Sequence, residues 1–285
     1  MSSSRDRGAA TPIARRIHSL PYWHSISRVT GLASKATMTR LVSAEAILGE
    51  QPEPTADTAV PVRVRELGGN TVWLRPRSRD RAALEFLHLG HHLPPAGLNR
   101  PVRHAAVFGA HIGLLAADLA ARYPQARVLG VEADHDNAVL ARRNLARFGS
   151  RCTLREAAVW HCDETLTVTW EPDAWGQIVT SPVPGTGHVP RNGSKATVRH
   201  IDGIDAAAVL AGFTGPAPVD YLLVNIETGW HELLRHGQWT ANVHCIKIEI
   251  QDHYDEVVPL LEALGYQAQL LRLGWGAFAT GIRSG

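Results

Sequence analysis

Two glycines and a glutamate are the residues best placed for binding chemistry. Gly109 and Gly113 enclose Ala110 and His111 in a turn that follows an apolar segment and opens a helical one. Such a turn lets the backbone approach a ligand closely and points unpaired amides at it. Glu132 ends the next apolar segment, about 20 residues after Gly113, where a carboxylate accepts hydrogen bonds from both hydroxyls of a ribose. The spacing predicts a nucleoside-containing cofactor, and we expect a bulky side chain at either glycine to block it before unfolding the domain.

A third segment ends in residues suited to an adenine pocket. It closes with Glu156, Ala157 and Ala158, while Ala133 adjoins Glu132. A lone G-x-x-x-G pattern matches many ordinary turns, and a single acidic residue at a strand end is usually only solvated. Three such ends in the expected order favour a binding crevice over three unrelated structural features.

A parallel sheet must position these strand ends. From residue 104 onward, short apolar segments alternate with helical ones, which requires parallel pairing with right-handed crossovers. The expected strands are 105–108, 127–131, 152–156, 220–226, 243–250, 267–271 and 277–281, and the expected helices are 114–122, 135–148 and 254–264. The pattern predicts a doubly wound α/β sheet.

Composition shifts divide the chain into segments. Residues 1–50 are patchily amphipathic and predict an accessory helical segment, interpreted as a lid or a dimer contact. Residues 51–61 have the composition of a linker, and residues 62–103 predict a β-hairpin and a helix. Residues 104–285 form the cofactor-binding domain, in which residues 165–200 are an insertion that reads equally well as a lid or a solvated loop.

Several motifs together resemble those of the FkbM-type methyltransferases. They are Gly-Ala-x-Ile-Gly from Gly109, Val-Glu-Ala-Asp from Val131, Arg-Arg-Asn-Leu from Arg142, Glu-Ala-Ala-Val from Glu156, the segment 219–227, and Ile248-Glu249. The resemblance runs from about residue 62 to the end of the chain. It implies a Rossmann-like class I methyltransferase fold, with a mostly parallel seven-stranded sheet and helices on both faces. It also implies S-adenosylmethionine (SAM) as cofactor and methyl transfer to a hydroxyl of a small-molecule acceptor, a sugar or a secondary metabolite, as in antibiotic biosynthesis.

The resemblance also assigns roles by position. The methionine side of the cofactor would be lined by the glycine turn, the ribose would be held by Glu132, and the acceptor would be faced by Asn225 and Glu227. The full set expected at the cofactor is Gly109, Ala110, His111, Gly113, Glu132, Ala133, Glu156, Ala157 and Ala158.

Five positions depart from the family pattern. Val107 and His111 stand where the family has Asp and Asn, and Leu223, Asn225 and Trp230 replace Lys, Asp and Glu. Valine cannot help hold the amino group of the cofactor. The departures keep two alternatives open, which are a degenerate homologue that binds SAM without transferring methyl and the same scaffold used for another reaction.

Proton removal from a hydroxyl acceptor needs a base. His253, which follows the fifth strand, is the first candidate because imidazole accepts protons near neutral pH. Glu227 supports it and His231 is the next candidate, with Asn225 beside the acceptor.

Composition and spacing exclude other functions. The net charge is only +2, so nucleic acid is not an expected partner. No apolar run approaches the ~20 residues that span a bilayer, and the three cysteines form no C-x-x-C pair, so we expect a cytoplasmic protein without a membrane contact. His231 and His236 are spaced to diverge around a helix, unlike the ligands of a zinc protease. With Asn at 225, Glu227 and Glu249 are an incomplete oxygen ligand set, so no metal is predicted.

Overall fold

The computed structural model describes residues 55–75, 78, 80–170, 178–180, 197–227, 229–274 and 276–283. The accessory segment predicted at residues 1–50 lies outside these ranges. No helix within the described ranges combines the length and the apolar character needed to cross a membrane.

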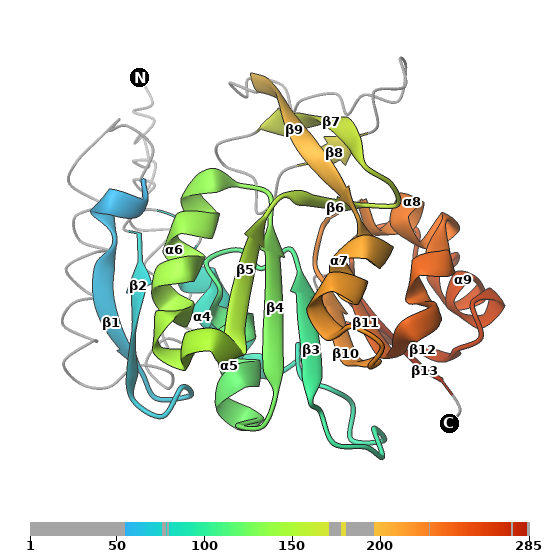
Figure 1. Ribbon diagram of the computed structural model, residues 1–285, viewed down its shortest axis with the longest axis horizontal. Coiled ribbons are helices and arrows are strands. Elements are labelled where there is room, and N and C mark those ends of the chain that lie inside the picture. The colour runs from blue at the N-terminus through green and yellow to red at the C-terminus, as the bar shows by residue number, and fades with distance from the viewer. Residues whose placement is uncertain are drawn as a thin grey trace, which may run out of the picture.

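A seven-stranded sheet organises the molecule (Figure 1). Its order is β12 (Gln267–Arg272), β13 (Ala277–Ile282), β11 (Val243–Ile250), β10 (Val219–Val224), β3 (His104–Phe108), β4 (Arg127–Glu132) and β5 (Cys152–Glu156). The five strands from β11 to β5 pair in parallel, and β13 runs antiparallel to both of its neighbours. This arrangement confirms the predicted Rossmann-like fold class, a mostly parallel seven-stranded sheet.

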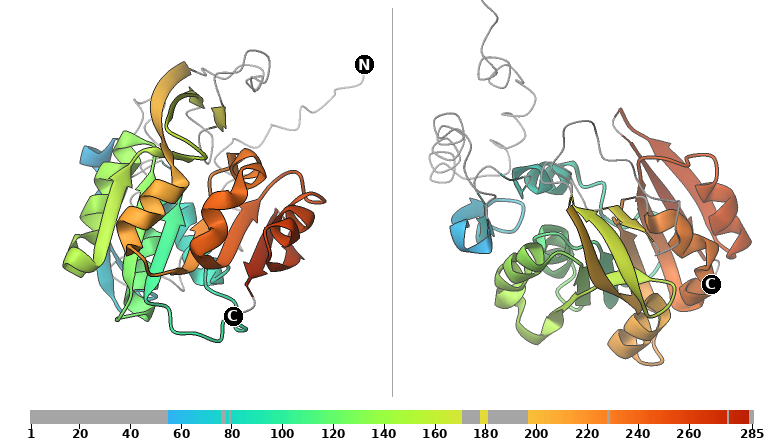
Figure 2. Two further views of the ribbon diagram at one scale, coloured as in Figure 1. Left: turned by 45° about the vertical axis from the view of Figure 1, so that its right-hand side comes forward. Right: turned by 90° about the horizontal axis from the view of Figure 1, so that it is seen from above.

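Helices cover both faces of the sheet, as Figure 1 and Figure 2 show. One apolar core contains α4 (Asp80–Leu89), α5 (Leu114–Arg122) and α6 (His135–Leu145), and the other contains α7 (Ala206–Thr214), α8 (Gly229–Arg235) and α9 (Val257–Ala263). Successive strand residues alternate between the two cores: Val107 packs in the first and Phe108 in the second. Short 3₁₀ turns, η2 (Ala146–Arg151) and η3 (Gly237–Asn242), lead into β5 and β11.

A β-hairpin packs against α6. Strand β1 (Val60–Val64) pairs with β2 (Asn70–Leu74), and a 3₁₀ turn, η1 (Ala56–Thr58), precedes them, so the end of the predicted linker is structured. Asn144 on α6 joins the hairpin to the glycine turn: its Oδ1 accepts from the amide of Trp73 at 2.6 Å, and its Nδ2 donates to the carbonyl of Ile112 at 2.8 Å.

A second, four-stranded sheet stands at the upper edge of the main sheet in Figure 1. Its order is β6 (Ala158–Trp160), β9 (Thr197–Asp205), β7 (Glu164–Trp170) and β8 (Ile178–Thr180). The insertion was predicted to span residues 165–200, whereas this small sheet extends from Ala158 to Asp205. The parallel pair β6 and β9 encloses the other two strands along the chain, and such a non-local pairing leaves no local signal in the sequence.

Candidate functional site

The glycine turn is fixed by backbone packing as well as by its own conformation. Gly109 has φ 76°, and a Cβ at this position would lie 1.8 Å from the carbonyl oxygen of Asn225. Gly113 has φ 81° at the start of α5, and its Cβ would lie 3.1 Å from Ala141 on α6. Both backbone conformations favour glycine, and at Gly109 the nearest atoms are backbone, so a side chain there would also disturb the fold. The expectation that a bulky side chain at either glycine blocks a ligand before it unfolds the domain stays a prediction.

The amides of this turn are paired within the chain. Those of Gly109 and Ala110 donate to the carbonyl of Val131, each at 2.9 Å, and that of Gly113 donates to Ala110 at 2.8 Å. The amide of His111 donates to Oε2 of Glu132 at 2.7 Å. The expectation of unpaired amides is wrong for these four residues, because the turn closes onto the end of β4. An anion finds no free donor among these four amides.

Glu132 lies at the end of β4 and is 8% exposed. Besides the His111 amide, it accepts the Asp134 amide at 3.0 Å and the Asn137 side chain at 3.3 Å, both at Oε1. Burial raises the pKa of the Glu132 carboxyl group, and the two backbone hydrogen bonds act in the opposite direction. Three of roughly four acceptor positions of this carboxylate are occupied, so a ribose diol that donates twice would displace one internal hydrogen bond.

Two residues that were not singled out from the sequence support the surroundings of Glu132. Asp80 is fully buried and forms a bidentate pair with Arg75, through Nε at 3.0 Å and a terminal nitrogen at 2.7 Å. Arg75 also donates to Asn137 at 2.5 Å, and Asn137 in turn contacts Glu132. Nε2 of His111 lies 3.6 Å from Asp80, and desolvation lowers the pKa of that imidazole although the Asp80 charge opposes the shift. Local sequence carries no signal for this network, because its members come from separate elements.

The predicted adenine-side residues divide between the two sheets. Glu156 ends β5, and its carboxylate accepts from His135 at 2.7 Å and from Arg142 at 2.8 Å, which lowers its pKa. The amide of Ala157 donates to the carbonyl of Glu132 at 2.9 Å. Ala158 is buried and begins β6, in an apolar cluster against which Ala133 packs. The alanines thus form a short apolar wall where the small sheet leaves the main one.

Three residues after neighbouring strands share an unusual backbone conformation. Within the described ranges, the non-glycine residues with positive φ are His111 at 48°, Glu227 at 50° and His253 at 49°. They follow β3, β10 and β11, which are adjacent in the sheet, so all three belong to the edge formed by the carboxyl ends of the strands. Backbone in this region costs of order 1–3 kcal/mol per residue and is concentrated at functional sites in proteins. All three were nominated from sequence.

Two carboxyl groups meet at the same edge. Glu249, near the end of β11, is 7% exposed, and its Oε2 has no hydrogen-bond partner in the described part of the chain. Burial, together with the nearby charge of Glu227, raises the pKa of Glu249 to about 8. Glu249 therefore holds a proton at neutral pH.

Asn225 lies between β10 and Glu227, and its backbone amide donates to the carbonyl of Phe108 at 2.8 Å.

The two candidate histidines share one carboxylate. Nδ1 of His253 lies 2.9 Å from Oε1 of Glu256, and Nε2 of His231 lies 2.8 Å from Oε2 of the same residue. The two rings stack with centroids 4.4 Å apart and planes 12° apart, and Trp230 meets both edge to face. Glu256, which the sequence analysis did not identify, thus orients both imidazoles. We call His231, His253 and Glu256 the histidine pair site.

Comparisons with known proteins add a likeness of fold. No protein-family model matches the sequence, and no curated protein matches it. Among solved structures, precorrin-6y C5,15-methyltransferase from Geobacter metallireducens is 12% identical over 64% of this chain and 80% of its own, with a TM-score of 0.39. The ribosomal protein L11 methylase from Lactobacillus delbrueckii subsp. bulgaricus is 14% identical over 72% of this chain and 80% of its own, with a TM-score of 0.38.

Three of the positions at which the sequence departs from the FkbM-type pattern are core residues. Val107 and Leu223 are paired neighbours in β3 and β10, and Trp230 on α8 is fully buried. A lysine does occur on the neighbouring strand β11, where Lys247 pairs in register with Leu223. Its ammonium group donates to the carbonyls of His91 and Leu93. Val107 and Leu223 offer no polar group to a ligand, and the indole N–H of Trp230 is buried without a hydrogen-bond partner among the described residues.

A surface cavity of about 630 Å³ lies at the opposite edge of the sheet. Arg100, His244 and Gln267 line it, and the last two stand at the amino-terminal ends of β11 and β12. Ligands of open α/β sheets bind outside the carboxyl ends of the strands. This cavity is therefore separate from the candidate site.

Proposed function

We propose that the protein is a SAM-dependent methyltransferase that acts on a hydroxyl group of a small molecule, such as a sugar or a secondary metabolite. The main support is the conformation shared by His111, Glu227 and His253 after three adjacent strands, next to the buried Glu132. The resemblance of the motifs to FkbM-type methyltransferases supports the choice of a hydroxyl acceptor.

The residues at the edge fit the cofactor in part. SAM, when bound, supplies an activated methyl group on its sulfonium centre. Glu132 would accept a ribose hydroxyl at its remaining position, and the glycine turn would allow close approach of the methionine part. Because the amides of the turn are paired, its carbonyl oxygens suit the amino group of the cofactor better than its amides suit the carboxylate.

The histidine pair site would accept the proton of the hydroxyl. The hydrogen bond between Nδ1 of His253 and Glu256 orients the ring and leaves Nε2 to take the proton of the substrate hydroxyl. This Nε2 lies 3.9 Å from the carboxylate of Asp252. His231 would stabilise the same carboxylate from the other side. Glu249 is protonated at neutral pH because burial raises its pKa to about 8, so it would donate a hydrogen bond rather than act as the base.

Single-turnover methyl transfer from labelled SAM tests this proposal, with a panel of hydroxylated acceptors. General-base catalysis is worth about 10²–10⁴-fold in rate, so His253→Ala should reduce the rate at least tenfold while SAM affinity changes little. His88 provides a matched control, because its imidazole also pairs with a glutamate, Glu66 at 3.1 Å, but belongs to α4 away from the edge. A His253→Ala rate equal to that of His88→Ala would remove His253 from the mechanism.

A second function is favoured by the burial of the substituted positions. Val107, Leu223 and Trp230 are at most 1% exposed and fill the core where the family carries ionisable groups. A protein that binds SAM or its product without transferring methyl would show this pattern. Binding of SAM with no transfer to any acceptor in the same panel would favour this second function.

A further inference from the structure

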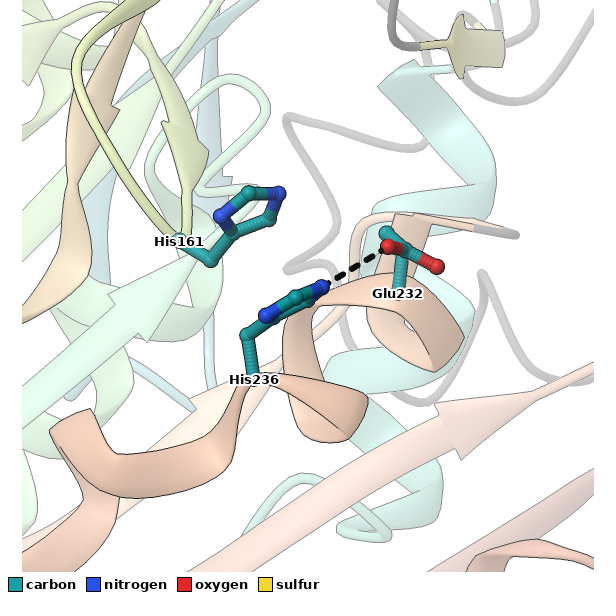
Figure 3. A group of neighbouring side chains, drawn as sticks. All are labelled: His161, Glu232 and His236. Carbon is teal, nitrogen blue, oxygen red and sulfur yellow. Dashed lines mark hydrogen bonds and ion pairs between the residues drawn. The ribbon is translucent and has the colours of Figure 1, made fainter.

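A separate group of ionisable side chains joins the small sheet to α8 (Figure 3). His161 directly follows β6, while Glu232 lies on α8 and His236 directly follows it. One donor atom of each residue lies within 4.8 Å of the other two. Figure 3 shows the two imidazoles approaching from opposite elements, with the Glu232 carboxylate beside His236.

The backbone already holds these three side chains close together. Glu232 and His236 are four residues apart and so share one face of the helix, with Oε1 and Nε2 separated by 3.1 Å. The ring of His236 stacks on that of His161, with centroids 4.1 Å apart. His161 is anchored by its neighbour Trp160, which is 2% exposed. The Trp160 ring packs beside Gly229, at the start of α8, where an added Cβ would lie 3.8 Å from it.

We propose that His161, Glu232 and His236 bind a divalent transition-metal ion, with zinc as the expected occupant. Two imidazoles and one carboxylate are a donor set that zinc accepts, with ligand distances of about 2.0–2.2 Å. Tetrahedral ligands at those distances stand roughly 3.3–3.5 Å apart. The side chains of Glu232 and His236 are 42% and 51% exposed, so both can rotate to close the remaining separation.

The connection between β6 and β7 offers further donors on the same side. Cys162 and Glu164 form an overlapping group with His161, again with donor atoms within 4.8 Å of one another. Nε2 of His161 is 4.0 Å from Glu164, beyond hydrogen-bond distance, so this nitrogen is not held by that carboxylate. One of these two residues, or water, would complete four-coordination.

The histidine pair site is the competing location for a metal, because it also contains two imidazoles and a carboxylate within 4.8 Å. There, however, Glu256 already makes a hydrogen bond of 2.8–2.9 Å to each imidazole. Metal binding would have to replace both bonds. At the proposed site one hydrogen bond, between His236 and Glu232, is replaced, and the stacked rings of His161 and His236 must tilt apart.

An ion at this position would fasten the base of the small sheet to the helix layer of the main sheet. His161 belongs to the first connection of the small sheet, Glu232 belongs to α8, and His236 directly follows α8. Binding should therefore slow amide hydrogen exchange in β6, β7 and β9 as well as in α8. A metal held only by exposed side chains of α8 would not protect the small sheet.

Titration of the chelator-treated full-length protein tests the site, with Zn²⁺ by calorimetry and Co²⁺ by visible absorption. We expect one ion per chain and tetrahedral Co²⁺ bands. His236→Ala and Glu232→Gln should each weaken affinity at least about tenfold, since even the loss of residues outside the ligand shell costs 10–100-fold at metal sites. His253→Ala is the matched control, because its side chain is 44% exposed and it removes a ligand from the competing group.

Each other outcome would overturn the proposal. These outcomes are the absence of stoichiometric binding of either ion, binding that His236→Ala and Glu232→Gln leave unchanged, and binding lost in His253→Ala instead. Circular dichroism of each variant establishes that it is folded. Both substituted side chains are largely at the surface, so the fold should be retained.

Discussion

Among single residues, the buried Glu249 should make the stability of the fold depend on pH. Its folded-state pKa of about 8 lies above the ordinary value of 4.5, so the folded protein keeps a proton that the unfolded chain has released. The contribution of Glu249 to the free energy of unfolding is therefore largest below pH 4.5 and falls as pH rises to about 8. Glu249→Gln lacks this titration. Between these pH values, the free energy of unfolding of the parent protein should fall by roughly 3–5 kcal/mol more than that of the variant. Urea denaturation at a series of pH values measures both. Glu262→Gln, at an exposed position on α9, is the control, and parallel curves for Glu249→Gln and the parent would contradict the burial argument.

Between elements, two glycines separate the contribution of packing to stability from that of backbone strain. Gly109 and Gly69 have φ of 76° and 77°, but a Cβ at Gly109 would strike the Asn225 carbonyl, whereas one at Gly69 would meet nothing within 4 Å. Gly69→Ala should cost only the strain of a left-handed conformation, about 1–2 kcal/mol. Gly109→Ala should cost at least about 2 kcal/mol more, since backbone must move to relieve the clash. Urea denaturation of both variants measures the difference. Equal losses in the free energy of unfolding would show that the backbone near Gly109 accommodates a side chain at no additional cost.

The same turn shows where sequence reasoning succeeds and where it ends. Alternation of apolar segments predicted the seven strands of the main sheet and the helices α5, α6 and α9, but not α7 or α8. Asp134 begins α6 as an N-cap, and its carboxylate accepts the backbone amide of Asn137 at 2.7 Å. Contacts between elements were not predictable. The carbonyl that fixes Gly109 belongs to a residue more than a hundred positions away. Likewise, His111 lies 21 positions from its partner Glu132, and His231 lies 25 positions from its partner Glu256.

At the scale of the whole molecule, the main sheet and the small sheet have different origins in the sequence. The main sheet follows from regular strand and helix alternation, while the small sheet depends on β6 and β9 pairing across the inserted strands. That pairing brings His161 to α8. The expectation of no metal set aside His231 with His236, and Glu227 with Glu249, and it did not connect His161 to either group. The carboxyl edge, by contrast, was anticipated because parallel strands must end together.

The proposed cofactor site is best tested by calorimetric titration with SAM and with S-adenosylhomocysteine. We expect one binding site per chain for each compound. Glu132→Gln, which keeps one acceptor oxygen and nearly the same volume, should weaken SAM affinity by about 1–3 kcal/mol, the range for leaving a polar group unpaired. Glu262→Gln should bind as the parent does. Failure of the folded parent protein to bind either compound, or unchanged affinity in Glu132→Gln, would contradict the assignment of this edge as a SAM site.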